Sequence, residues 1–171
     1  MPMSEYIRGL RARLGPSLLH VPSVTALVFD ANDRVLLARH SNGGVWVAPG
    51  GAIDPDEAPQ DAVVREVWEE TGLHVEPSRF VGVFGGPEFR VRYENGDQVS
   101  YVMSVFECRE IGGALRADGE EILEVGYFAA SELAALDLSP WAKLVLPHLA
   151  THRGASWIPA VRWRPPVSRG P

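Results

Sequence analysis

The segment from Ala58 to Gly72 constrains the fold of this chain more than any other stretch, because both ends of one helix can be read from it. Pro59 is typical of the first turn of a helix, and Gly72 is typical of the position just past its end. The pattern therefore predicts a helix from Ala58 to Thr71. The last turn of that helix carries an unusual arrangement of charge.

Three carboxylates crowd this last turn. Glu66, Glu69 and Glu70 are three and four residues apart, so their side chains share one face, where like charges repel. They also lie at the C-terminal end, where the helix dipole is already negative. A bound cation resolves both penalties, and an oxygen-only ligand set favours Mg2+ or Mn2+ over Zn2+. The alternative is an ordinary surface helix in which Arg65 and Glu69 form a salt bridge.

Together with flanking glycines, these residues form a longer motif. It resembles the complete signature of the Nudix hydrolases at Gly51, Glu57, Arg65, Glu66, Val67, Glu69, Glu70, Gly72 and Leu73. The surrounding segments fit the family's layout from about residue 21 to residue 149. The resemblance implies an α+β fold, an α/β/α sandwich in which a mixed central sheet is flanked by helices on both sides.

The resemblance also implies which atoms hold the metal. Glu69 and Glu70 would be the principal ligands, and Glu66 would be a further ligand or the group that positions the attacking water. The backbone carbonyl of Gly50, directly before the signature glycine, would be another ligand. The expected cofactor is Mg2+ or Mn2+.

Further residues are candidates for positioning and substrate binding. Arg65 is expected to hold Glu66 or Glu57 through charge-assisted hydrogen bonds, for which its planar guanidinium is suited. The candidate substrate contacts are Arg39, Glu57 and Trp46. Arg39 ends a predicted strand and can reach a phosphate, although an arginine in such a place is usually solvated or ion-paired. Trp46 can equally be a core residue.

Three helix-borne glutamates on one side of a metal leave its opposite side open to another segment. The available group is Glu120, Glu121 and Glu124, and relatives often draw a catalytic glutamate from this loop. We choose Glu121 as the general base by its offset from Tyr127, with Glu120 as the alternative. Glu124 is expected to be a strand residue that faces solvent. A solvated acidic loop without catalytic function is the remaining reading.

A carboxylate cluster that holds Mg2+ suits the attack of water on phosphorus, so the predicted activity is hydrolysis of phosphoanhydrides. We expect a nucleoside diphosphate linked to another moiety, of the ADP-ribose or nucleotide-sugar type. One alternative is a nucleoside triphosphate pyrophosphohydrolase of the house-cleaning type. Another is a non-catalytic nucleotide-binding regulator with the same fold, although such a protein would usually show a damaged acidic set.

Composition limits the other classes of function. The 171 residues are 46% hydrophobic and 22% charged, as in an ordinary soluble domain, and the apolar runs are too short for a membrane span. We therefore expect a cytoplasmic protein. The net charge of −6 argues against nucleic-acid binding. The single cysteine, Cys108, is expected to be a packing residue.

The chain divides into three expected parts, which are an N-terminal helical extension (1–20), the Nudix domain (21–150) and a Pro/Arg-rich tail (151–171). Within them we predict strands at 21–29, 34–39, 45–47, 75–83, 89–93, 99–108 and 123–128, and helices at 4–14, 131–136 and 140–149. The first two strands are expected to form a hairpin, and so are 89–93 and 99–108 around the turn 94–97. Residues 111–119 are expected to be a loop.

The tail differs from the rest of the chain in its composition. It has Arg153, Arg162, Arg164 and Arg169, no acidic residue, and the tryptophans Trp157 and Trp163. We expect these tryptophans to dock on the domain or on a second subunit, which leaves a homodimer open; the alternative is an RNA-binding arm.

Overall fold

The computed structural model describes residues 4–157, and its strands form two sheets. The first sheet is mixed and has the order β1-β6-β4, with β5 also paired to β6. Its strands are β1 (Leu19–Val28), β4 (Leu73–Phe84), β5 (Arg90–Arg92) and β6 (Gln98–Gly113). β1 runs parallel to β6, whereas β4 and β5 are antiparallel to it. β6 is therefore central, as its apolar residues on both faces predict.

The second sheet is antiparallel, with the order β3-β2-β7. Its strands are β2 (Val35–His40), β3 (Trp46–Val47) and β7 (Ile122–Phe128). The predicted hairpin of residues 21–29 with 34–39 is wrong, because β1 and β2 lie in different sheets and share only an isolated bridge between Phe29 and Val35. One edge of β1 pairs with β6, and its other edge is hydrogen-bonded to the loop around residues 49–53.

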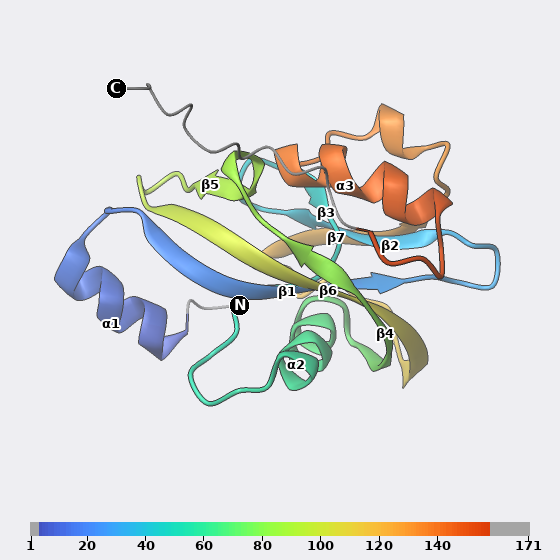
Figure 1. Ribbon diagram of the computed structural model, residues 1–171, viewed down its shortest axis with the longest axis horizontal. Coiled ribbons are helices and arrows are strands. Elements are labelled where there is room, and N and C mark those ends of the chain that lie inside the picture. The colour runs from blue at the N-terminus through green and yellow to red at the C-terminus, as the bar shows by residue number, and fades with distance from the viewer. Residues whose placement is uncertain (1–3, 158–171) are drawn as a thin grey trace, which may run out of the picture.

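Helices cover this arrangement on two sides (Figure 1), which confirms the predicted α+β sandwich. α2 (Pro59–Thr71) buries Ala62, Val63 and Val67 in one apolar core, and α3 (Pro140–Thr151) lies in a second core on the other side. α2 ends where predicted, because Gly72 adopts the left-handed conformation and its N–H donates to the carbonyl of Trp68. Cys108 is buried in the α2 core, as expected for a packing residue.

α1 (Glu5–Leu14) begins at the predicted cap, since the Ser4 hydroxyl accepts a hydrogen bond from the N–H of Ile7. Figure 1 shows this helix apart from the other two, at the end of the mixed sheet where β5 and β6 turn. The predicted hairpin around 94–97 is confirmed by the pairing of Arg92 with Gln98. The division into parts at residues 20 and 150 stays a prediction.

Two predicted segments differ in the structure. The helix expected at 131–136 is only the 3-10 turn η2 (Leu133–Ala135). The chain becomes extended after this turn, because Leu138 forms a β-bridge with Trp46. Residues 111–113, predicted as part of a loop, continue β6, since β4 extends its ladder to Gly113. A further 3-10 turn, η1 (Pro87–Phe89), precedes β5.

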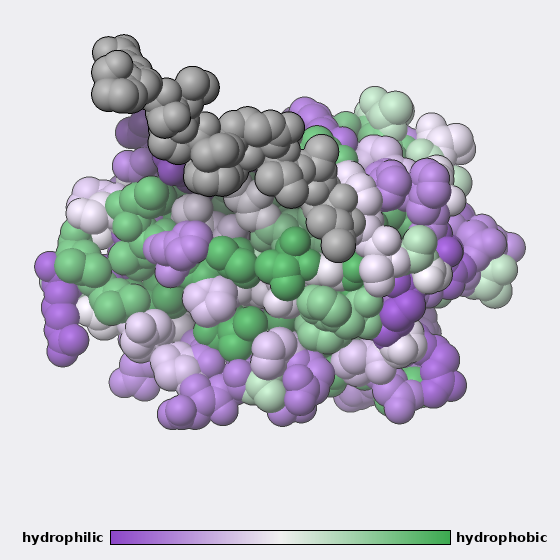
Figure 2. Space-filling view, in the orientation of Figure 1, coloured by the Kyte–Doolittle hydropathy of each residue, from purple (hydrophilic) through white to green (hydrophobic). Residues whose placement is uncertain are grey.

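The surface and the described part of the tail add two observations. Figure 2 shows apolar side chains in the middle of one face and hydrophilic ones around much of its edge; Phe80 and Val83 of β4 are each about half exposed. Trp157 docks on the domain, with its ring 5.6 Å from Phe84 and 4.2 Å from His148.

Trp163 and the last three arginines lie outside the described residues, and the homodimer stays a prediction. No helix within residues 4–157 is long and apolar enough to span a membrane.

Candidate active site

The loop before α2 is pressed between β1 and the helix, and two glycines make this possible. A Cβ on Gly50, whose φ is 156°, would lie 2.2 Å from the carbonyl oxygen of Val24. A Cβ on Gly51 would lie 2.5 Å from a carboxylate oxygen of Glu66. Only glycine allows this approach, so the loop backbone lies directly against the glutamates of α2.

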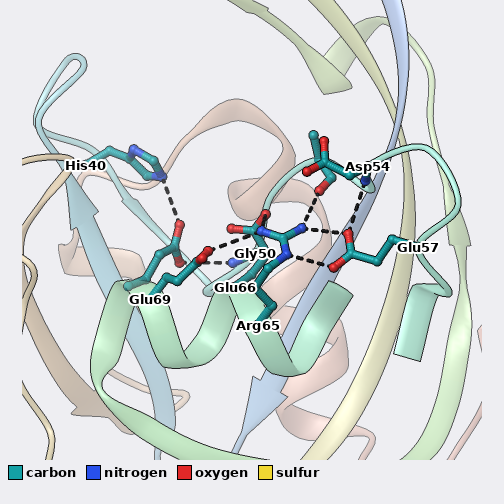
Figure 3. Close-up of polar contacts among 9 residues, drawn as sticks. His40, Gly50, Asp54, Glu57, Arg65, Glu66 and Glu69 are labelled. Atoms are coloured by element: carbon teal, nitrogen blue, oxygen red, sulfur yellow. Dashed lines mark hydrogen bonds and ion pairs between the residues drawn. The ribbon is translucent and has the colours of Figure 1, made fainter. Parts of the chain in front are cut away.

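Arg65 is the centre of the polar contacts on α2 (Figure 3). Its guanidinium grips both carboxylate oxygens of Glu57 at 2.7 Å, and it donates to Glu66 at 2.8 Å and to Glu69 at 3.1 Å. It also donates to the carbonyl of Ala52 at 3.1 Å. The hydrogen bonds from Arg65 to Glu57 hold the pKa of Glu57 below its usual value. The salt bridge expected of a surface helix is thus present, but as one part of a larger network.

Glu66 and Glu70 are not surface residues, since they are only 4% and 2% exposed. Burial raises the pKa of Glu66 to about 7, although Arg65 opposes this shift. The pKa of Glu70 is raised well above its usual value, first by burial and then by the charge of Glu66. The N–H of Gly50 donates to Glu70 at 3.0 Å. Two buried, mutually repelling carboxylates therefore lie side by side.

The residues present fit a hard divalent cation. Their ligands would be carboxylate and carbonyl oxygens, and a cation would offset the burial and repulsion of Glu66 and Glu70. A nearby carboxylate oxygen, Oδ1 of Asp54, is buried without a hydrogen-bond partner among the described residues. Within residues 4–157, no three acidic, histidine or cysteine side chains already meet at metal-binding geometry. One carboxylate oxygen of Glu69 accepts a hydrogen bond from Arg65.

Glu121 lies in the loop directly before β7. Its carboxylate is 3.8 Å from Nδ1 of His40, and Nε2 of the same histidine is 3.9 Å from Glu70. The backbone N–H groups of Glu121 and its two neighbours all donate to Asp118, which fixes the loop. The charge of Glu121 contributes to the raised pKa values of Glu66 and Glu70. The loop glutamate and the helix glutamates thus share one electrostatic environment.

A cavity of about 800 Å3 connects these groups. The predicted site residues that line it are Gly50, Arg65, Glu66, Glu70 and Glu121. Those that do not line it are Arg39, Trp46, Glu57 and Glu69.

The two strand residues proposed as substrate contacts point elsewhere. The guanidinium of Arg39 pairs with Glu124 on β7, whose side chain is 56% exposed. The ring of Trp46 packs edge-on against Phe128 at 4.8 Å. Their roles as substrate contacts stay predictions.

Sequence reasoning did not identify the cations at the far side of this cavity. Arg90 and Arg92 on β5 line it, and both are exposed. Neither side chain has an ion-pair partner among the residues that the structure describes. The spacing of Arg90 and Arg92 around Val91 could have identified them, because residues two apart on a strand face the same side of the sheet.

The raised pKa of Glu66 predicts how pH affects the metal-free protein. A carboxyl that titrates at about 7 when folded and near 4.5 when unfolded binds more protons in the folded state. Its contribution to stability is therefore lost as pH rises from about 4.5 to about 7, a change of about 3 kcal/mol. A cation requires the ionised carboxylates, so added Mg2+ should raise Tm more at the upper end of this window.

Thermal unfolding with EDTA and with Mg2+ across this pH range measures both effects. Glu66→Gln is the control, because it removes one of the two buried carboxyls with a raised pKa and should make the metal-free profile less steep. A metal-free Tm that rises through the same window would contradict the burial account.

The chain is similar in sequence and in structure to known proteins. Residues 19–149 match the family model of the NUDIX domain. A MutT-like protein of Streptomyces ambofaciens is 34% identical over 149 residues, covering 83% of this chain and 90% of the relative. A putative 8-oxo-dGTP diphosphatase of Bacillus subtilis is 30% identical over 115 residues, covering 67% and 70%. The crystal structure of an ADP-ribose pyrophosphatase from Streptococcus suis superimposes with a TM-score of 0.60 at 28% identity, covering 81% of this chain and 96% of the other.

Proposed function

We propose a substrate class and a set of roles from one premise: the chain belongs to the Nudix hydrolase family, and it is an enzyme that acts on phosphoanhydride bonds. The proposed reaction is Mg2+- or Mn2+-dependent hydrolysis of a nucleoside diphosphate linked to another moiety, of the ADP-ribose or nucleotide-sugar type. The main support for this reaction is the buried pair Glu66 and Glu70. Both residues line a cavity whose other lining residues lie well outside α2.

Hydrolases of this family generally use divalent metal ions. When bound, the cation would neutralise phosphate charge and lower the pKa of the attacking water. We assign Glu69 and Glu70 as its principal ligands, with the carbonyl of Gly50 and with Glu66 as further ligands. Arg65 orients Glu66 and Glu69 through the hydrogen bonds described above.

Proton transfer is assigned to Glu121. It lines the cavity opposite α2, and its side chain is 36% exposed, so water can reach it. A carboxylate in this place can accept the proton of the attacking water. Asp118 holds its backbone, and His40 lies between its carboxylate and that of Glu70.

Two candidate functions remain beside this one. The similarity to a putative 8-oxo-dGTP diphosphatase favours a nucleoside triphosphate substrate. Arg90 and Arg92 at the cavity, which have no ion-pair partner within residues 4–157, would suit an additional phosphate. A non-catalytic regulator is disfavoured, because each carboxylate of the signature is present. The similarity to an ADP-ribose pyrophosphatase supports the diphosphate class, and so does the cavity, which is lined beyond the carboxylates by residues of the β5–β6 hairpin.

A panel of phosphoanhydrides separates these functions. Purified protein should cleave ADP-ribose or a nucleotide sugar to two phosphomonoesters with Mg2+ or Mn2+, and EDTA should abolish the activity. Release of pyrophosphate from triphosphates alone would establish the second candidate, and no turnover at all would favour the regulator. Glu121→Gln in the same assay should lower kcat roughly 100-fold or more, with little change in KM.

A further inference from the structure

The cavity extends past the carboxylates to a wall made by two elements outside the signature. α1 contributes Ile7 and Arg11, and its N-cap Ser4 also lines the wall. The hairpin of β5 and β6 contributes Tyr93 and Tyr101 among others. The apolar side chains of α1 pack with this hairpin and with β1 in a small core of their own. The N-terminal helix is therefore part of the cavity and not an appendage to it.

Arg11 fastens this wall together. Its side chain is only 9% exposed, and it pairs with Asp97 at 3.4 Å in the turn of the hairpin. It also donates to the carbonyls of Gly15, Ser17 and Gln98 at 3.1, 2.6 and 2.8 Å. Because α1 has no fully buried residue of its own, these polar contacts carry much of its attachment. Arg11 thus fixes the hairpin relative to the cavity.

The two tyrosines of the wall form a couple with unused hydrogen-bonding capacity. Their hydroxyl oxygens are 2.8 Å apart, so one hydroxyl donates to the other. Each phenol has a single O–H, and one of the two hydrogens therefore remains without an acceptor in the described part of the chain. Lone pairs on both oxygens are also available. The couple can donate one hydrogen bond to a ligand and accept another.

The couple also lies close enough to the catalytic carboxylates to be affected by them. Burial raises the pKa of both tyrosines, and the charges of Glu66 and Glu121 raise that of Tyr101 further. Both phenols are therefore neutral at physiological pH. In this negative environment, a neutral group that both donates and accepts is the complementary partner, and a sugar hydroxyl has these properties.

We propose that the Tyr93–Tyr101 couple is a specificity subsite, which hydrogen-bonds a sugar hydroxyl in the half of the substrate beyond the cleaved bond. Arg11 is the positioning residue that holds the hairpin in place. This inference rests on the proposed function, since it takes the substrate to be a nucleoside diphosphate linked to a sugar. A site built to bond a hydroxyl rejects the analogue that lacks it, so the couple would decide which sugars are accepted.

The direct test uses a non-hydrolysable probe, α,β-methylene ADP-ribose, titrated by calorimetry in the presence of Mg2+. Tyr101→Phe and Tyr93→Phe should each weaken binding roughly tenfold, because one buried hydrogen-bonding group is lost. Tyr127→Phe is the matched control, since its hydroxyl bonds Glu110 and does not line the cavity. It should bind the probe as tightly as the wild type does.

Kinetics test the positioning role separately. Arg11→Gln should raise KM for ADP-ribose with little change in kcat, and it should reduce the preference over a counterpart that lacks a hydroxyl on the terminal ribose. A merely structural role would lower Tm without moving that preference.

Three outcomes would overturn the subsite. They are equal affinity of Tyr101→Phe and Tyr127→Phe, an unchanged preference in Tyr101→Phe, and no binding of the probe by the wild type. Tight, tyrosine-dependent binding without hydrolysis of any phosphoanhydride would instead overturn the proposed function and leave the subsite standing.

Discussion

Glu70→Gln is expected to lower metal-dependent turnover on the order of 100-fold or more, and to leave the metal-free fold intact or more stable. Glu70 is 2% exposed and repelled by Glu66, so its charge destabilises the protein when no cation is present. Glutamine keeps an oxygen that can accept the hydrogen bond from Gly50 and removes the charge. Steady-state kinetics with Mg2+ and thermal unfolding in EDTA measure the two effects.

The control for this prediction is Glu76→Gln. Glu76 is 57% exposed and pairs with Arg109 on the surface, so its replacement should alter neither turnover nor Tm appreciably. A large fall in the metal-free Tm of Glu70→Gln would mean that Glu70 serves as a structural hydrogen-bonding group and not as a metal ligand.

Arg65→Ala should have the largest effect on stability, because it removes the donor that three glutamates share. Glu66 is buried, and removing the partner of a buried charge costs about 3 kcal/mol or more. Glu57 and Glu69 lose their fixed orientations as well, so kcat should fall together with Tm. Denaturant unfolding and initial rates measure the change.

Arg65→Lys separates charge from geometry. Lysine retains the positive charge but cannot make the two parallel hydrogen bonds to Glu57. Compared with Arg65→Ala, we therefore expect Arg65→Lys to recover part of the stability and little of the kcat. The surface substitution Arg109→Ala is the control. Unchanged kcat in Arg65→Ala would remove the orienting role assigned to this residue.

Local signals predicted the elements that local chemistry determines. Pro59 and Gly72 bracket α2 because each has a conformational preference that suits one helix end, and Asn95 with Gly96 predicts the β5–β6 turn for the same reason. The partner of β1 could not be found in this way. β1 pairs with β6, and the sequence between them contains four other strands and the helix α2, so proximity along the chain favoured the wrong partner, β2.

In the candidate site too, features set by local sequence could be predicted, whereas features set by tertiary contacts could not. Helical spacing was enough to place Glu66 and Glu70 on one face, but not to show that both are buried, since that depends on the loop pressed over them. The ion pair of Arg39 with Glu124 depends on the register of β2 with β7. The tyrosine couple was also beyond prediction, because Tyr101 lies diagonally across the hairpin from Tyr93 and not opposite it.

Mn2+ binding tests most directly whether the glutamates of α2 hold a divalent cation. Electron paramagnetic resonance of free Mn2+, titrated with protein above pH 7, reports the bound fraction without any substrate. We predict that the wild type binds Mn2+ and that Mg2+ competes for the site. We also predict that Glu69→Gln and Glu70→Gln bind Mn2+ much more weakly, whereas Glu76→Gln binds it normally. Equal Mn2+ binding by wild type and Glu70→Gln, or none by the wild type at millimolar Mn2+, would contradict this prediction.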